Sequence, residues 1–330
     1  MSQTFNALVV NKEEENFTVK VQSLTMQDLP EGDVLIRVSY SGVNYKDSLA
    51  SIPNGNIVRS YPFVPGIDLA GIVESSEDPR FKKGDEVIAT SYEIGVSHFG
   101  GYSEYARVKA DWVVPLPKGL TLKEAMTIGT AGFTAALCVQ RLEENGLTPE
   151  KGPVLVTGAT GGVGSFAVSI LATRNYQIEA STGKTSESEY LKNLGANEIL
   201  SREDVYDGKI KALGKQKWSA AVDSTGGEML ASVISQIQYG GAVAACGLTA
   251  GTNLPTTVFP FILRGINLLG VDSVYCPMET RAKTWERLAT DFKPTNLDSF
   301  IQQEVTLQEL PDALPTLLEG KARGRIIVKL

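Results

Sequence analysis

The sequence is poor in the residues that metal centres and disulfide frameworks require. Its 330 residues include three cysteines, Cys138, Cys246 and Cys276, and one histidine, His98. These residues are far apart in the sequence and form no Cys-x-x-Cys pair. A structural zinc site needs four such ligands and a catalytic site usually needs at least one Cys or His, so we expect no metal site. We expect His98 to have a structural or surface role rather than a catalytic one.

Long apolar runs and an excess of basic charge are also missing. No run of about 18 apolar residues occurs, and the first residues lack the basic and apolar regions of a signal peptide. The net charge of −7 argues against a nucleic-acid surface. We therefore expect a cytoplasmic protein that binds neither membranes nor nucleic acids. The hydrophobic content of 42% is typical of globular proteins, and the length predicts two domains.

The most informative segment present is a glycine-rich turn between a predicted strand at 154–158 and a predicted helix at 162–174. Its glycines stand at positions 158, 161 and 164. Glycines allow the backbone to approach a phosphate closely, and the free N–H groups of a helix N-terminus bind an anion. Such a motif alone is a weak signal, because glycines also occur in these turns for packing reasons. With its flanking strand and helix, it predicts the pyrophosphate site of a dinucleotide.

The end of the second predicted strand, 177–182, indicates which dinucleotide binds. An NAD-binding unit usually places a carboxylate there for the ribose 2′-OH. This chain instead has Ser181, Thr182, Gly183 and Lys184. Because a phosphate monoester carries nearly two negative charges, two hydroxyls and a lysine favour the 2′-phosphate of NADPH. The alternative is a solvated lysine in a polar turn. We expect NADPH.

The remaining pattern predicts an α/β protein with two kinds of domain. Short strands at 34–40, 67–73 and 85–89, each preceded by turn residues, predict a β-rich, barrel-like domain. From 154 to about 272 strands and helices alternate, which predicts a doubly wound parallel sheet. The last segment, 325–330, is too short to stand alone and is expected to return to the first domain. The other expected elements are strands at 177–182, 198–200, 219–223, 242–246 and 267–272, and helices at 187–194 and 227–238.

Four strings resemble the medium-chain dehydrogenase/reductase superfamily, in its zinc-free quinone oxidoreductase-like branch. The resemblance implies a GroES-like catalytic domain at 1–124, an NADP-binding Rossmann domain at 125–272, and a segment at 273–330 that returns to the catalytic domain. The strings are Gly42-Val43-Asn44-Tyr45-Lys46-Asp47, Pro65-Gly66-Ile67-Asp68-Leu69-Ala70-Gly71, Thr130-Ala131-Gly132-Phe133-Thr134-Ala135 and Gly158-Ala159-Thr160-Gly161-Gly162-Val163-Gly164.

The departures from the zinc alcohol dehydrogenases agree with the shortage of metal ligands. Where that branch carries a zinc cysteine before its aspartate, this chain has Asn44-Tyr45-Lys46-Asp47. Where it carries Gly-His-Glu, this chain has Gly66-Ile67-Asp68. We therefore expect hydrogen-bond donors, and no metal, to stabilise charge in the reaction.

Segments 76–81, 244–248, 254–264 and 270–273 are similar to bacterial NADPH-dependent acrylyl-CoA reductases. The resemblance implies hydride transfer to the β-carbon of an activated double bond, converting acrylyl-CoA to propanoyl-CoA. Two alternatives stay open. One is a reductase of quinones or α,β-unsaturated carbonyls, and the other is an NADPH-binding protein with little turnover.

The resemblance also implies the site residues. Tyr45 and Asn44 are the catalytic candidates, with Tyr45 orienting the nicotinamide and relaying a proton, although Tyr45 is alternatively an aromatic packed at a domain interface. Asp47 is expected to be a helix-entry or interdomain hydrogen-bonding group rather than a base. Lys46, Arg59 and Arg264 are candidates for a CoA phosphate. The implied cofactor contacts are Tyr45, Thr160, Gly161, Gly162, Val163, Thr182, Gly183, Lys184, Arg202, Leu248, Ile262, Ser273 and Arg325. Arg202 is alternatively an exposed arginine after a strand.

The sequence also suggests how copies of the chain associate. Residues 266–271 form an apolar run at the expected edge of the Rossmann sheet, where relatives pair. Such an edge is unfavourable in water. We expect a homodimer.

Overall fold

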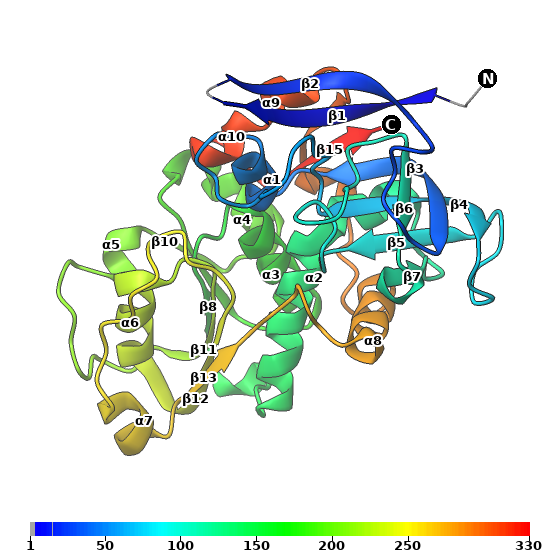
Figure 1. The fold of residues 1–330 in the computed structure, drawn as a ribbon. Helices are drawn as coiled ribbons and strands as arrows, with labels where there is room; N and C mark the ends of the chain where they lie inside the picture. Colours follow the sequence, from blue (N-terminus) through cyan, green and yellow to red (C-terminus); the bar gives the residue numbers. More distant parts are fainter. Residues whose placement is uncertain (1–3, 15) are drawn as a thin grey trace. The chain divides into compact units, whose positions relative to one another are not determined.

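The computed structural model describes residues 4–14 and 16–330, and the chain separates into two compact units. Figure 1 shows their elements. The chain passes between the units at several points, two of which lie near the predicted boundaries at 124/125 and 272/273. Unit 1 contains the chain up to residue 130 together with 274–289 and 296–330, and unit 2 contains 131–273 and 290–295.

Unit 1 is built on a seven-stranded sheet in the order β14-β15-β3-β4-β5-β7, with β6 also paired to β3. Strands β3 (Val34–Gly42), β4 (Asp68–Ser76) and β5 (Glu86–Thr90) confirm the three predicted strands. Val34, Ile36 and Val38 alternate along β3 and are buried in one hydrophobic core. This period of two places one face of the strand in the core. Strands β6 (Tyr105–Val108) and β7 (Val113–Pro115) complete this part of the sheet.

The C-terminal strand joins the same sheet. β15 (Arg325–Lys329) pairs in antiparallel fashion with β3, with Ile327 opposite Gly42, and in parallel with β14 (Ile301–Thr306). Four of its five residues are buried, so the strand is stable only inside a sheet. The predicted return of the tail is confirmed. We did not predict β14, because its mostly polar and exposed residues lack the pattern of a half-buried strand.

An N-terminal hairpin that we did not predict packs on unit 1. β1 (Thr4–Glu13) and β2 (Asn16–Thr25) pair along their whole length. β1 contributes Phe5, Ala7, Leu8 and Val9 to a core that also contains residues of β15. Burial on this core stabilises a hairpin that would be marginal alone.

Unit 2 is a doubly wound α/β unit, as predicted. Its six parallel strands follow the order β10-β9-β8-β11-β12-β13. β12 begins earlier than predicted, directly after α6, because a register shift opposite Trp218 and Ala220 accommodates the turn-like residues Gly240 and Gly241. The strands are β8 (Val154–Val156), β9 (Ile178–Ser181), β10 (Glu198–Leu200), β11 (Trp218–Asp223), β12 (Ile237–Ala245) and β13 (Asn267–Gly270).

The predicted helices of unit 2 are also present. α3 (Gly162–Thr173) and α6 (Gly227–Gln236) lie close to the predicted ranges, and α4 (Ser188–Asn193) is one residue shorter than predicted at each end, with a 3-10 helix at Thr185–Glu187 directly before it. The other helices are α1 (Tyr45–Ala50), α2 (Leu122–Glu144), α5 (Arg202–Val205), α7 (Phe259–Arg264), α8 (Met278–Ala289), α9 (Leu310–Ala313) and α10 (Pro315–Leu318). Across residues 4–14 and 16–330, no helix combines the length and apolarity that crossing a membrane requires.

Candidate active site

The glycine-rich turn of unit 2 connects β8 to the start of α3. Gly158 has a left-handed φ of +59°, and a Cβ on Gly164 would lie 2.4 Å from the Gly158 carbonyl oxygen. The helix begins after Gly161, and no side chain caps it. An uncapped helix start directs its first N–H groups toward an anion. The turn leaves these N–H groups without a side-chain cap, and the pyrophosphate site at Thr160–Val163 stays a prediction.

Hydroxyl groups hold this turn against the end of β9. The Oγ1 atoms of Thr160 and Thr182 lie 3.2 Å apart, and Thr182 Oγ1 accepts a hydrogen bond of 3.0 Å from the Lys184 amide. Ala159 N donates to the Ser181 carbonyl at 3.0 Å. Thr160 and Thr182 are both buried. The structure therefore brings together two of the segments expected to bind the nucleotide.

The Arg202 guanidinium packs on the backbone of Gly183, the residue before Lys184. A Cβ on Gly183 would lie 2.6 Å from Nε and 2.7 Å from Cζ of Arg202, so the guanidinium occupies the space that a side chain at position 183 would need. Burial lowers the pKa of Lys184, the Glu187 charge raises it, and the Arg202 charge lowers it further. Two neighbouring cations repel each other, and a bound phosphate relieves that repulsion. These residues fit a 2′-phosphate.

The other expected nucleotide contacts in unit 2 lie on separate elements. Leu248 follows β12 and is exposed, Ile262 is an exposed residue of α7, and Ser273 is half-buried at the end of unit 2. Their roles stay predictions.

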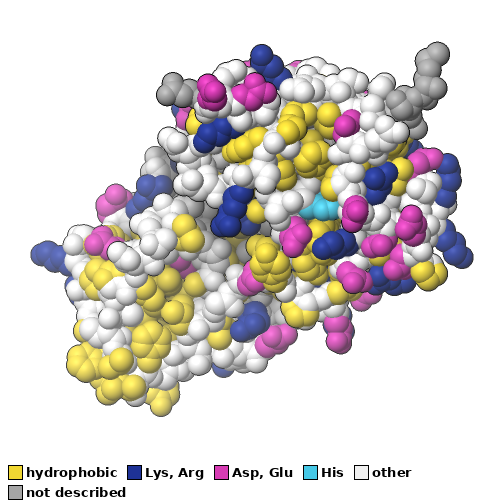
Figure 2. All heavy atoms as spheres, viewed as in Figure 1, with side chains coloured by type: hydrophobic (Ala, Val, Ile, Leu, Met, Phe, Trp, Pro, Cys, Tyr) yellow, Lys and Arg dark blue, Asp and Glu magenta, His cyan; other side chains and the backbone are white. Residues whose placement is uncertain are grey.

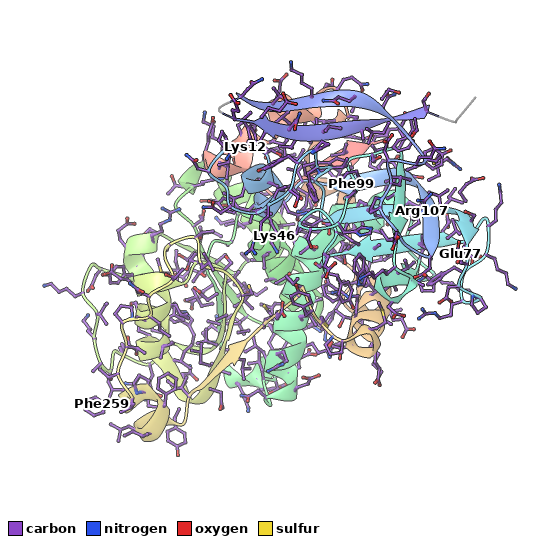
Figure 3. All side chains as sticks on the ribbon, in the orientation of Figure 1. Lys12, Lys46, Glu77, Phe99, Arg107 and Phe259 are labelled. Atoms are coloured by element: carbon purple, nitrogen blue, oxygen red, sulfur yellow. The ribbon has the colours of Figure 1, made fainter. Side chains whose placement is uncertain are left out.

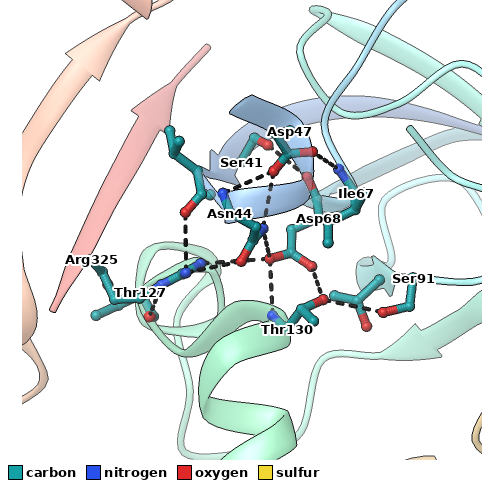
Figure 4. A network of polar contacts seen from close by, with 12 residues as sticks. Ser41, Asn44, Asp47, Ile67, Asp68, Ser91, Thr127, Thr130 and Arg325 are labelled. Carbon is teal, nitrogen blue, oxygen red and sulfur yellow. Dashed lines mark hydrogen bonds and ion pairs between the residues drawn. The ribbon is translucent and has the colours of Figure 1, made fainter. Parts of the chain in front are cut away.

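In unit 1, both the oxygen and the nitrogen of the Asn44 side-chain amide form hydrogen bonds (Figure 4). Its Oδ1 accepts a hydrogen bond of 2.9 Å from Arg325 Nη1. Its Nδ2 donates to Asp68 Oδ2 at 2.8 Å and to Asp47 Oδ2 at 3.2 Å. Asn44 is 8% exposed and Arg325 is 3% exposed. The amide groups of Asn44 are therefore engaged inside unit 1.

Arg325 is packed tightly by glycines. It also donates from Nε to the Thr127 carbonyl at 3.1 Å and from Nη1 to the Val43 carbonyl at 3.2 Å. A Cβ on Gly42 or Gly129 would lie 2.6 or 2.5 Å from Nη2, and Gly129 kinks α2 with a φ of +50°. Nη2 lies 3.6 Å from Asp68 Oδ2, and no hydrogen bond to it is present in the described part of the chain. Arg325 orients Asn44, and its expected contact with the cofactor stays a prediction.

Asp68 links this cluster to α2. Its Oδ2 accepts from the Thr130 amide at 2.9 Å and its Oδ1 from Thr130 Oγ1 at 2.5 Å. The sequence alone assigns no role to Asp68 or Thr130, although both lie in strings that resemble the family. Contact between two segments 62 residues apart has no local signature.

Asp47 fixes the start of α1. Its carboxylate accepts hydrogen bonds of 2.9 Å from the amides of Asn44 and Ile67. This agrees with the expected helix-entry role. Desolvation by burial raises the pKa of Asp47 to about 7, with the Asp68 charge adding to the rise. Tyr45, the first residue of α1, is 49% exposed, so its ring is accessible to a ligand.

The candidate phosphate cations differ in their surroundings. Lys46 is half-buried on α1 (Figure 3), and Arg59 is exposed. Arg264 instead donates to the carbonyls of Ser235, near the end of α6, at 2.8 Å and of Gly214, in the segment before β11, at 2.6 Å, so its guanidinium is engaged with main-chain carbonyls.

The single histidine of the sequence, His98, makes structural contacts. His98 lies 2.7 Å from the Arg107 carbonyl through Nε2, and its ring packs edge-on against Trp112 with centroids 5.1 Å apart. The cysteines form no disulfide. Between residues 4 and 330, position 15 aside, no three His, Cys, Asp or Glu side chains cluster as a metal ion would require.

The raised pKa of Asp47 predicts a dependence of stability on pH. Between the ordinary pKa of 3.8 and about 7, the folded state holds a proton that the unfolded state has released. The free energy of unfolding should therefore fall as pH rises through this window, by up to about 4 kcal/mol. Urea unfolding at several pH values measures the slope. Asp47→Asn should flatten it, while the exposed Asp312→Asn should leave it unchanged. An unaltered slope in Asp47→Asn would contradict the assignment.

Two family models match the chain. The alcohol dehydrogenase GroES-like domain matches residues 30–118, and the zinc-binding dehydrogenase model matches residues 162–290. The chain is 60% identical to the putative quinone oxidoreductase YhfP of Bacillus subtilis over 100% of both chains. It is 50% identical to the acrylyl-CoA reductase AcuI of Ruegeria pomeroyi over 98% of both.

Solved structures agree along the whole chain. The Bacillus subtilis yhfP structure with NAD bound has a TM-score of 0.98 at 60% identity and covers 100% of both chains. The Salmonella enterica yhdH oxidoreductase in complex with NADP has a TM-score of 0.96 at 47% identity, covering 98% of this chain and 99% of that one. The chain therefore belongs to the zinc-free branch of the medium-chain dehydrogenase/reductase superfamily, with a GroES-like and a Rossmann-like domain.

Proposed function

We propose that this protein is a cytoplasmic, NADPH-dependent reductase of an activated carbon–carbon double bond. The observation that carries the choice of cofactor is the pair of cations at Gly183. Lys184 follows Gly183 in the sequence and the Arg202 guanidinium packs on Gly183, where an NAD-binding unit usually has a carboxylate. Relatives have been crystallised with NADP and with NAD. The two cations favour the phosphorylated nucleotide.

Different groups of residues would bind different parts of NADPH. Thr160, Gly161, Gly162 and Val163 would hold the pyrophosphate at the start of α3. Thr182, Gly183, Lys184 and Arg202 would hold the 2′-phosphate. Leu248, Ile262, Ser273 and Arg325 stay proposed contacts that complete the site. When bound, NADPH supplies the hydride.

Reduction requires this chain to stabilise negative charge on the substrate oxygen and to deliver a proton to the α-carbon. Hydride addition at the β-carbon leaves an enolate, so a donor must face that oxygen. The Asn44 amide is already bonded to Asp68 and Arg325. We assign Asn44 to positioning the start of α1, and we assign Tyr45, whose ring is exposed, to orienting the nicotinamide and relaying the proton.

Acrylyl-CoA is the substrate we favour, with propanoyl-CoA as product. The 50% identity to an acrylyl-CoA reductase over 98% of the chain supports it. Lys46 and Arg59 are the cations available for a CoA phosphate, because Arg264 is engaged with main-chain carbonyls. The 60% identity to a putative quinone oxidoreductase supports a quinone or enone as the second candidate.

Charge reversal at Lys184 tests the cofactor. Lys184→Glu should raise the Kd for NADPH by about 10- to 100-fold, because a charge-assisted bond is replaced by repulsion of the phosphate. The Kd for NADH should change little. The exposed Lys192→Glu is the matched control and should leave both Kd values unchanged. Titration of nucleotide fluorescence measures them. Equal losses for both nucleotides in Lys184→Glu would show that Lys184 does not recognise the 2′-phosphate.

Paired assays test the substrate. NADPH oxidation should show a higher kcat/KM with acrylyl-CoA than with a small quinone. The opposite ranking would favour the quinone reductase. Tight NADPH binding without consumption of either substrate would favour a binding protein with little turnover.

We also propose a homodimer formed at the edge of the unit 2 sheet. β13 is an edge strand, and Leu268 on it is 37% exposed. Val258, Phe259 and Leu263, in and beside α7, are 63%, 46% and 56% exposed. Figure 2 shows hydrophobic side chains gathered over α7, and Figure 3 shows Phe259 at its outer side. Exposed apolar side chains gathered in this way mark an association surface.

Sedimentation tests the dimer. The mass should be twice 35.5 kDa at micromolar concentration. Phe259→Glu combined with Leu263→Glu should give monomers, because charge at the centre of an apolar interface is costly. Ile210→Glu, at a residue that is 39% exposed elsewhere in unit 2, should leave the dimer intact. A monomeric wild-type protein would disprove the proposal.

A further inference from the structure

A turn of unit 1 contacts two residues of the same unit, each of which lies next to a position where the chain passes between the units. The chain leaves unit 1 after Thr130 and re-enters it at Val274. Both residues contact the segment Thr90–Tyr92, which ends β5 and follows it. The hydrogen bonds and ring contacts that this turn makes lie within unit 1. They connect the turn to two residues for which we have proposed roles in cofactor binding.

The first connection runs through Ser91. Its Oγ lies 3.2 Å from Thr130 Oγ1, and Thr130 in turn donates to Asp68. Asp68 accepts from the side chain of Asn44, which directly precedes Tyr45. Figure 4 shows these side chains in line. A chain of hydrogen bonds therefore joins the turn to the start of α1.

The second connection runs through Tyr92 and Arg281. Tyr92 N donates to the Val274 carbonyl at 3.2 Å, and Tyr92 Oη donates to the Cys276 carbonyl at 3.1 Å. The buried Arg281 donates from Nη2 to the same Val274 carbonyl at 3.2 Å. These bonds hold the three residues that follow Ser273.

The turn itself has an unfavourable backbone conformation. Ser91 and Tyr92 have φ values of +67° and +51°. Left-handed φ in non-glycine residues costs free energy, and such residues persist where surrounding contacts determine them. Arg281 supplies these contacts, with Cζ 4.6 Å from the Tyr92 ring and Nη1 2.9 Å from Thr90 Oγ1. Trp112 stacks on the Tyr92 ring at 6.0 Å.

We propose that Ser91, Tyr92 and Arg281 are positioning residues for the reductase reaction. Ser91 would orient Tyr45 through Thr130, Asp68 and Asn44. Tyr92 and Arg281 would orient Ser273 by holding the residues directly after it. Glycine would form this turn without strain, but it would supply neither the hydroxyl nor the ring that reaches these segments. The inference rests on the proposed function, because Tyr45 and Ser273 are proposed cofactor contacts.

Two conservative variants separate the two connections. Tyr92→Phe removes the bond to Cys276 and keeps the ring between Arg281 and Trp112. It should raise the Kd for NADPH about three- to tenfold, as expected for one lost hydrogen bond, with little change in kcat. Ser91→Ala removes the bond to Thr130. It should lower kcat by a similar factor and leave the Kd for NADPH nearly unchanged.

A readout without cofactor accompanies these measurements. In the free protein, Tyr92→Phe should accelerate amide hydrogen exchange at residues 274–276. Tyr176→Phe is the matched control, because its hydroxyl donates to the Leu147 carbonyl at a similar 3.2 Å. It should change neither the exchange at 274–276 nor the Kd for NADPH.

The outcomes distinguish this inference from the proposed function. If Tyr92→Phe and Ser91→Ala lower only the unfolding temperature, with wild-type Kd and kcat, the turn has a structural role and the inference is overturned. If each variant both raises the Kd for NADPH and lowers kcat, instead of changing only one of the two, the two separate connections are disproved. If wild-type protein neither binds NADPH nor reduces a substrate, the proposed function fails first.

Discussion

Burial of the Arg325 guanidinium beside Asp68 and Asp47 is the constraint on which the rest of unit 1 depends. These three ionisable groups are almost completely removed from water. Burying ionisable groups is costly, and here hydrogen bonds to Asp68, to Asp47 and from the Nε and Nη1 atoms of Arg325 offset that cost. The Asn44 amide supplies bonds to both signs of charge, accepting from Arg325 and donating to Asp68. The position of Asn44, and with it the start of α1, is therefore determined by electrostatics as well as by packing.

That cluster explains several features that otherwise look unrelated. The left-handed Gly129 kinks α2 beside the Arg325 guanidinium, where a Cβ would collide. The last strand of the chain pairs with β3 and brings Arg325 to the cluster. The strained turn after β5 reaches the same cluster through Thr130. The side chains of this cluster bind one another, and Tyr45, the residue after Asn44, is exposed.

The proposed nucleotide site of unit 2 is built differently. Its polar groups are backbone groups of the turn, hydroxyls and two cations, and glycines leave the space that these groups occupy. Gly164 lets α3 pack on the turn, and Gly183 lets Arg202 lie against the backbone beside Lys184. The proposed nucleotide site of unit 2 therefore depends on local, glycine-dependent contacts, whereas unit 1 depends on buried long-range contacts that orient Asn44.

The sequence by itself determined the features that local pattern encodes. The alternation of strands and helices from 154 to 272 predicted the doubly wound sheet, and the glycine turn with Lys184 predicted the nucleotide site. The short apolar end of the chain predicted the return of β15. Tertiary structure alone decided that Asp68 contacts Thr130, that Arg281 packs on the Tyr92 ring, and that the polar strand β14 belongs to the sheet. The physical reason is the separation along the sequence between the residues that interact. Turn and helix signals lie within a few residues, whereas a buried ion pair or a strained turn depends on partners that only folding brings together.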